Sequence, residues 1–139
     1  MEGKNQIYKE IKNQSDAVLY FLQQLDIEMI DSILDPNRTY QNLEKHLFIQ
    51  KLGVALDKFI QSGDTYLNRH QGHCNSKTCN YKGKGFSFIG NNSGNYINLI
   101  IEIKEGIVLN IYECYIFNCL TKIASKNDRI EIEKLEPPF

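Results

Sequence analysis

The stretch that decides the fold is YINLIIEIKEGIVLNIYECYIFNC, which runs from Tyr96 to Cys119. It contains two apolar segments of strand length, rich in Ile, Val and Tyr, on either side of Glu105-Gly106. Residues of these types favour strands, and the dipeptide is a weaker relative of the Asp-Gly signal for a two-residue turn. The stretch therefore predicts a long antiparallel hairpin that turns at Glu105-Gly106.

A turn at this position also predicts which residues share a face of the hairpin. One face is nearly all apolar and is expected to pack on helices, with Ile103 opposite Val108, Leu99 opposite Tyr112 and Ile97 opposite Cys114. The other face is mixed, with Tyr96, Asn98, Ile100 and Glu102 across from Tyr115, Glu113, Ile111 and Leu109. Two interpretations of the mixed face stay open. It is a solvated outer face, or it is a pocket wall on which Glu102, Glu113 and Tyr115 could act as acid or base.

The residues before the hairpin predict helices. In the first segment, apolar residues recur at steps of three, four and seven, at Ile7, Ile11, Val18, Leu22 and Leu25. This spacing places one apolar stripe along a helix. Ser15 and Asp16 could instead cap a later start of the same helix.

Two further helices are expected. The second is short and follows Asp26, a plausible N-cap, because the residue before Pro36 is pushed out of helical geometry. Thr39 or Asn42 is expected to open the third helix, which ends near Gly63, where a left-handed cap favours glycine. The apolar stripe of this third helix comprises Phe48, Leu52, Ala55, Leu56, Phe59 and Ile60.

After residue 63 the pattern changes from helical spacing to alternation. Strands are expected over residues 64–70 and 84–90, a turn over residues 91–95, and a final strand over residues 128–136. Helices followed by an antiparallel sheet predict an α+β fold. We expect three N-terminal helices packed on a curved antiparallel sheet, in a cone-like roll.

Length and composition narrow the class of protein. The chain has 139 residues, 42% of them hydrophobic, and a formal net charge of −1 at pH 7. These values suit a single domain over residues 1–139, helical over about 5–63 and sheet over about 64–136. The near-neutral charge argues against nucleic acid as a partner.

Targeting signals are not evident in the sequence. The N-terminal MEGKNQIYKEIKNQSD has no apolar core segment, so a secretory signal is not expected. The longest apolar run, INLIIEI, is far too short to cross a bilayer. We therefore expect a cytoplasmic protein without a membrane partner, whose thiols stay reduced.

Cysteine and histidine residues gather in the glycine-rich loop 69–85. Four residues separate Cys74 from Cys79, and His70 and His73 stand just before them. Thiolate and imidazole ligands at such spacing are typical of zinc sites, so these four residues are candidate metal ligands. The alternative is a polar connection that holds no cofactor, with partly buried cysteines and solvated histidines.

A second pair, Cys114 and Cys119, has the same spacing. Residues five apart in a regular strand point to opposite faces, so at most one of this pair is expected to join the loop. Cys114 falls on the predicted core face, where it is expected to act as a small buried hydrophobe.

Residues 65–101 contain no Asp or Glu, but they contain Arg69, Lys77, Lys82 and Lys84. Together with neighbouring aromatic residues, these charges could form a surface for an anion or for single-stranded nucleic acid. Charges spread over a stretch this long are usually only solvated side chains. Nucleic acid is therefore not the expected partner.

Three segments resemble the nuclear transport factor 2-like, or cystatin-like, superfamily. FLQQLDIEMIDSIL (21–34) is similar to the opening in which a short helix and a loop follow a leading helix. LEKHLFIQKLGVALDKFIQSG (43–63) is similar to the third helix, and YINLIIEIKEGIVLNIYECYIF (96–117) is similar to the closing strands. The resemblance implies a cone in which a long helix and two shorter ones wrap a curved antiparallel sheet.

The superfamily includes isomerases, hydrolases, dehydratases, polyketide cyclases and non-enzymatic binding or dimerisation modules. The resemblance implies a small-molecule pocket at the open end of the cone, but it transfers no catalytic residue, and the Cys/His loop departs from the usual pattern. We predict non-catalytic binding of a small molecule or a protein partner, by a homodimer formed through the sheet. The alternatives are a small-molecule enzyme of the isomerase or hydrolase type, using the cone pocket, and a zinc-stabilised interaction module.

Overall fold

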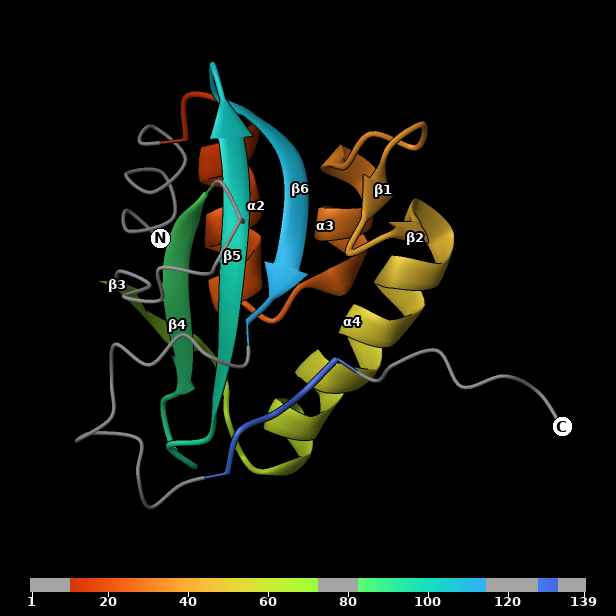
Figure 1. The fold of residues 1–139 in the computed structure, drawn as a ribbon. Coiled ribbons are helices and arrows are strands. Elements are labelled where there is room, and N and C mark those ends of the chain that lie inside the picture. Colours follow the sequence, from red (N-terminus) through yellow and green to blue (C-terminus); the bar gives the residue numbers. More distant parts are fainter. Residues whose placement is uncertain (1–10, 73–82, 115–127, 133–139) are drawn as a thin grey trace, which may run out of the picture.

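The computed structural model describes residues 11–72, 83–114 and 128–132. Within these ranges the chain forms three helices, a four-stranded antiparallel sheet and a two-stranded sheet (Figure 1), which confirms the α+β prediction. No helix in the described ranges has the length and apolar character that crossing a membrane requires. In chain order the elements are α2 (Gln14–Gln23), α3 (Ile27–Ile33), β1 (Thr39–Tyr40), β2 (Leu43–Glu44), α4 (Lys45–Gln61), β3 (Leu67–Gly72), β4 (Lys84–Gly90), β5 (Tyr96–Lys104) and β6 (Ile107–Glu113).

The first two helices start at side-chain caps. Asn13 precedes α2, and its Oδ1 accepts a hydrogen bond from the backbone N–H of Asp16 at 3.0 Å. This start lies near the later of the two expected positions, and Ile7 lies outside the described residues. Asp26 caps α3 as predicted, because its Oδ1 accepts from the N–H of Met29 at 3.2 Å.

The third helix begins later than the sequence predicts. Thr39 and Asn42 do not open it; they belong to a two-stranded hairpin, β1–β2, that precedes α4. Gln41 and Asn42 form its turn with φ values of 52° and 61°, the left-handed pair that a tight two-residue turn requires. The α4 stripe is buried as expected except for Ile60, which is 49% exposed. Gly63 ends the helix with a φ of 92°, as predicted.

The large sheet has the strand order β3-β4-β5-β6, and all its neighbouring strands are antiparallel. The predicted turn at Glu105-Gly106 is confirmed, with φ values of 53° and 77°. Ile103 pairs with Val108 as expected, but the register shifts between Glu102 and Ile103. The shift corresponds to a β-bulge, in which one extra residue of β6 is accommodated.

The register shift overturns the predicted faces of β6 beyond Val108. Leu99 pairs with Glu113 instead of Tyr112, and Cys114 donates its N–H to the carbonyl of Asn98 at 3.1 Å instead of facing Ile97. A slip of one residue moves every later side chain to the opposite face. Ile111 and Glu113 therefore face the helices, and Tyr112 and Cys114 lie on the opposite face.

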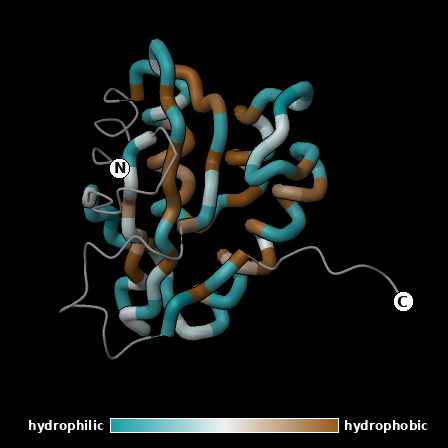
Figure 2. The backbone as a smooth tube through the Cα atoms, viewed as in Figure 1, coloured by the Kyte–Doolittle hydropathy of each residue, from teal (hydrophilic) through white to brown (hydrophobic). Residues whose placement is uncertain are grey.

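The helices cover one face of the sheet, and the hydrophobic core lies between them. Helix α2 contacts both β3 and β6, so it reaches across this face (Figure 1). Hydrophobic residues run along β5 and β6, whereas the connecting loops are mostly hydrophilic (Figure 2). The largest fully buried side chains are those of Tyr40, Phe48, Phe59, Phe88, Leu22, Ile30, Leu52, Leu56, Leu67, Ile97 and Leu99.

The opposite face of the sheet is buried at its centre. Ser87, Asn98, Ile100 and Cys114 each have at most 4% of their surface exposed. The Ser87 hydroxyl donates to Asn98 Oδ1 at 2.6 Å, so polar groups on this face bond to each other. The interpretation of a solvated outer face is therefore wrong for Asn98 and Ile100, the two of these residues that the sequence placed on the mixed face. Cys114 is buried as expected, but on the other face.

The predicted final strand is reduced to a single bridge in the described residues. Tyr96 donates its N–H to the carbonyl of Asp128 at 3.1 Å and accepts from the N–H of Ile130 at 2.7 Å. Tyr96 and Arg129 form a parallel bridge. Residues 128–132 therefore run beside the start of β5, and Ile132 is buried.

A buried carboxylate joins the end of α4 to the turn between β4 and β5. Asp64 is 3% exposed, and its oxygens accept from the N–H of Asn92 at 2.8 Å and from the N–H and hydroxyl of Ser93 at 2.7 and 2.6 Å. Gly90 lies against this carboxylate, so a Cβ there would overlap it. The glycine is needed for this close approach.

We predict that Gly90→Ala lowers the free energy of unfolding by about 2 kcal/mol, because the added methyl group displaces Asp64 from its hydrogen bonds. Gly53→Ala is the matched control: its Cβ would lie 3.4 Å from Ile27 Cγ1, an ordinary contact. Alanine is favoured over glycine inside a helix, so this variant should gain up to about 1 kcal/mol. Urea denaturation checks both values, and an equal effect of the two substitutions would contradict the account of Gly90.

Burial raises the pKa of the Tyr40 hydroxyl, which accepts a hydrogen bond from the N–H of Asp35 at 3.1 Å. The folded state therefore holds this proton where the unfolded chain, with a tyrosine pKa of about 10, releases it. The stability that comes from burying Tyr40 is complete below pH of about 10 and is lost as the pH rises above it. The free energy of unfolding of the wild type should thus exceed that of Tyr40→Phe by less above pH of about 10 than below it. Denaturant titrations at several pH values measure this difference.

Candidate functional site

The structure does not bring the predicted catalytic residues together. Glu102 pairs with Asn110 and lies on the face opposite the helices, whereas Glu113 pairs with Leu99 and faces them. The prediction that both carboxylates share one face is wrong, because the bulge lies between them in the hairpin. Tyr115 lies outside the described residues.

Glu113 holds the C-terminal segment against the sheet. Its side chain is buried, and Oε1 accepts from the backbone N–H of Ile132 at 3.0 Å. Its own N–H donates to Gln41 Oε1 at 2.8 Å. A buried carboxylate that is used in this way has a structural role, since it satisfies a backbone donor inside the core.

The candidate metal ligands fall mostly outside the described residues. His73, Cys74 and Cys79 are among residues 73–82, and His70 is an exposed residue of β3. Within the described ranges, no three His, Cys, Asp or Glu side chains lie close enough together to hold a metal ion. Cys114, the cysteine within the described ranges, is buried and belongs to no disulfide. The zinc site stays a prediction.

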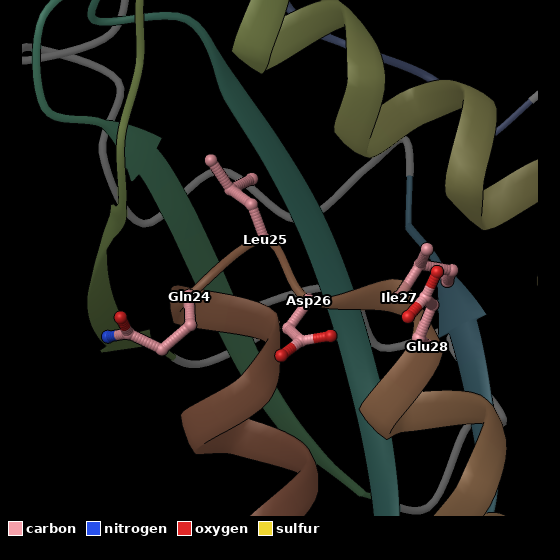
Figure 3. Close-up of a pocket in the computed structure, with 5 residues that line it drawn as sticks. All are labelled: Gln24, Leu25, Asp26, Ile27 and Glu28. Carbon is pink, nitrogen blue, oxygen red and sulfur yellow. The ribbon is translucent and has the colours of Figure 1, made fainter.

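A hollow of about 280 Å³ lies at the turn between α2 and α3. Its walls come from five consecutive residues, Gln24 to Glu28. Figure 3 shows the Asp26 carboxylate pointing into the space between the two helix ends, and Leu25 pointing away from it. The carboxylate already caps α3, so the hollow is the concave side of a tight turn, where Leu25 has a φ of 58°.

A larger cleft of about 550 Å³ lies between the start of α2 and the helix-facing side of the sheet. Its residues come from the start of α2, from β3, from β4 and from the β5–β6 hairpin. One wall is the first part of α2, the floor is formed by β3, β4 and β5, and the hairpin turn closes one end. The lining residues are Asn13, Ser15, Asp16, Leu19, Arg69, Gln71, Lys84, Phe86, Ile103 and Gly106.

Two hydrogen bonds to backbone groups of the hairpin fix the α2 wall of this cleft. The N–H of Ser15 donates to the carbonyl of Gly106 at 2.9 Å, and Gln14 Oε1 accepts from the N–H of Val108 at 2.8 Å. The Ser15 hydroxyl donates to Asn13 Oδ1 at 2.7 Å. The polar groups at the start of α2 therefore hold a fixed position at the closed end of the cleft.

Two positively charged side chains lie on the floor of the cleft. Arg69 on β3 and Lys84 on β4 are exposed, and neither forms an ion pair with a residue that the structure describes. Asp16 is the acidic residue of the lining, and its Oδ2 accepts from the N–H of Lys12 at 3.2 Å. The net positive charge of these lining residues therefore favours the binding of an anion.

An apolar surface lies beside these cations. Phe86 and Leu19 are buried to more than nine-tenths, and Ile103 is partly buried against the same core. The guanidinium carbon of Arg69 lies 5.9 Å from the centroid of the Phe86 ring, within the range of a cation–π contact. This contact orients the guanidinium over the floor of the cleft.

The sequence indicated part of this site. Arg69 and Lys84 belong to the stretch without acidic residues, which was the candidate surface for an anion or for single-stranded nucleic acid. The wall formed by Asn13, Ser15 and Asp16 was missed, and no local pattern could have predicted it. It depends on the contact of α2 with a hairpin turn far along the chain.

We predict that Glu113→Met lowers the free energy of unfolding by about 1–3 kcal/mol, because the buried N–H of Ile132 loses its acceptor. Glu113→Gln keeps a carbonyl oxygen and should lose less. Hydrogen exchange at the amide of Ile132 should accelerate in the methionine variant alone. Glu102→Met is the control on the opposite face; an equal loss of stability there would show that Glu113 has no special role.

No family model matches the chain, and no curated protein or solved structure matches it. The resemblance to the nuclear transport factor 2-like superfamily therefore stays a prediction.

Proposed function

We propose that this protein binds a small organic anion, without catalysis, in the cleft between α2 and the sheet. The proposal rests on one observation: two positively charged side chains lie beside an apolar surface in the same cleft. Arg69 and Lys84 have no ion pairs within the described chain, and Phe86, Leu19 and Ile103 lie beside them in one lining. A carboxylate or phosphate group would meet the cations, while an apolar part of the same molecule would contact the wall.

The chemistry of Arg69 supports an oxygen anion as the ligand group. A guanidinium presents a planar fork of donors that matches a carboxylate or a phosphate, and stacking on an aromatic ring leaves those donors available. Phe86 supplies this ring. Lys84 adds a second positive charge on the neighbouring strand, and Gln71 adds an amide that can donate or accept.

The positions of the two predicted catalytic carboxylates favour binding over catalysis, and Asp16, the acidic residue of the lining, accepts from the N–H of Lys12. Glu113 is engaged with Ile132, and Glu102 lies on the other face of the sheet. Neither carboxylate lines the cleft. The small-molecule enzyme and the zinc-stabilised module stay alternative predictions without a described site that favours them.

We also propose that the protein acts as a homodimer formed through its large sheet. The element order, with helices before an antiparallel sheet, supports placing the chain among the nuclear transport factor 2-like folds, several of which serve as binding or dimerisation modules.

The anion proposal is tested by titrating the protein with benzoate, benzamide and inorganic phosphate while backbone NMR shifts are recorded. We expect benzoate to shift the amides of Arg69, Lys84 and Gly106, and the neutral benzamide to bind at least about tenfold more weakly. Lys84→Gln and Arg69→Gln should each weaken benzoate binding by about tenfold, because each removes a charge-assisted hydrogen bond.

Lys104→Gln is the matched control for Lys84→Gln. Lys104 is also an exposed lysine of a strand, and the substitution changes the net charge equally, but it lies outside the cleft. It should leave benzoate binding unchanged. Equal binding of benzoate and benzamide, an equal effect of the two lysine variants, or no binding of either anion would overturn the proposal.

A further inference from the structure

The two edges of the large sheet differ in how their backbone groups are satisfied. On β6, the three N–H groups that point away from β5 all donate to side-chain amides. Val108 donates to Gln14 Oε1, Ile111 to Asn110 Oδ1 and Glu113 to Gln41 Oε1, each at 2.8 Å. This edge is therefore closed against pairing with another strand.

The edge formed by β3 is open along part of its length. The N–H of Asn91 donates to the carbonyl of Tyr66 at 3.1 Å across the β3–β4 pair. Hydrogen-bonded residues recur at every second position of an antiparallel ladder, so the backbone groups of His70 face β4, and those of Arg69 and Gln71 point away from the sheet. Both residues are exposed, and no group in the described chain bonds to their backbone.

Leu67 marks where the open part begins. Its carbonyl also points outward, but it accepts from Gln23 Nε2 of α2 at 3.1 Å. Among the described residues of this edge, the outward backbone groups that are both exposed and unbonded are thus those of Arg69 and Gln71, one N–H and one C=O each. A charge, a bulge or a proline blocks most exposed edges in stable proteins, and the charged side chain on this edge is that of Arg69.

We propose that β3 pairs with β3 of a second copy of this chain, antiparallel and about a two-fold axis that passes at His70. This inference rests on the proposed homodimer, and it uses the outward backbone groups of Arg69 and Gln71, whose side chains also line the anion cleft. In this register Arg69 of each copy lies opposite Gln71 of the other, in two hydrogen-bonded pairs. The two four-stranded sheets then join into one continuous sheet.

Alternative registers use the edge less well. Moving the axis to Arg69 places two guanidinium groups opposite each other, and like charges directly opposite are destabilising. That register also pairs Gln71 with Leu67, whose carbonyl is already engaged. In the register about His70, every outward backbone N–H and C=O of Arg69 and Gln71 forms a hydrogen bond with the second copy. The guanidinium of Arg69 also lies beside the side-chain amide oxygen of Gln71 from that copy.

The side chains of the edge favour a second copy over an unrelated peptide. Strand addition of a peptide takes its specificity from pockets for alternate side chains. The exposed residues of β3 are Asn68, Arg69, His70 and Gln71, which are polar on both faces. A second copy brings the same residues in reverse order, and Arg69 and Gln71 complement each other. The interface is small, so we expect reversible association.

The register is tested by disulfide trapping. In the proposed register, His70→Cys places the two new cysteines opposite each other in a non-hydrogen-bonded pair. The Cα atoms of such a pair lie about 4.5 Å apart, within the range of a disulfide, so mild oxidation should give a covalent dimer. Asn68→Cys is the matched control on the same strand and face, and Arg69→Cys reports the alternative register. Mass spectrometry of the cross-linked peptide distinguishes position 70 from the native cysteines.

A second variant tests the edge without a cysteine. Gln71→Pro removes an N–H that points away from β4, so the β3–β4 ladder stays intact while the partner loses its donor. Sedimentation velocity should show reversible dimerisation of the wild type and a monomeric Gln71→Pro variant whose circular dichroism is unchanged.

The outcomes separate this inference from the broader proposal. A wild type that is monomeric at every concentration would overturn both the homodimer and the β3 interface. A wild-type dimer that persists in Gln71→Pro, with no cross-link at position 70, would keep the homodimer and overturn the β3 interface. Cross-linking through Arg69→Cys instead of His70→Cys would overturn the register.

Discussion

The β-bulge between β5 and β6 is the constraint on which the arrangement of this protein depends. One extra residue in β6 exchanges its two faces, so Ile111 enters the core and Glu113 follows it. A carboxylate in that position needs a partner, and the N–H of Ile132 supplies it. The bulge thereby decides where the C-terminal segment is held, and it removes Glu113 from any site that would also contain Glu102.

Side-chain amides organise the other side of the same hairpin. Gln14 of α2 and Gln41 of the β1–β2 turn each accept from an outward N–H of β6, so elements far apart in the chain are tied to one edge. Gln14 belongs to the helix that also forms a wall of the anion cleft. The hydrogen bond between Gln14 and Val108 therefore both closes the β6 edge and positions the α2 wall of the cleft. The opposite edge, β3, receives a similar contact only at Leu67 among its described residues.

Much of the fold could be predicted from the sequence where local chemistry dominates. The strand over residues 84–90, the turn at Glu105-Gly106 and the caps at Asp26 and Gly63 were all found at their expected places. Alternation and turn residues act over a few positions, so they can be read locally. The β1–β2 turn was missed because Gln41-Asn42 is not among the usual dipeptides of a two-residue turn, and the contacts of Gln41 are with Asn110 and Glu113, far along the chain. The candidate site was predicted less well: Arg69 and Lys84 were named, but the α2 wall was not.

The sequence by itself determined the α+β class, the positions of most elements and the apolar stripes that form the core, because these follow from propensity and periodicity along the chain. The tertiary structure decided the register of β6 beyond Val108, the separation of Glu102 from Glu113 and the meeting of α2 with the β3–β4 floor. A register shift of one residue changes no local pattern in the sequence. It is set by whichever pairing satisfies more hydrogen bonds and buries more apolar surface across the whole sheet.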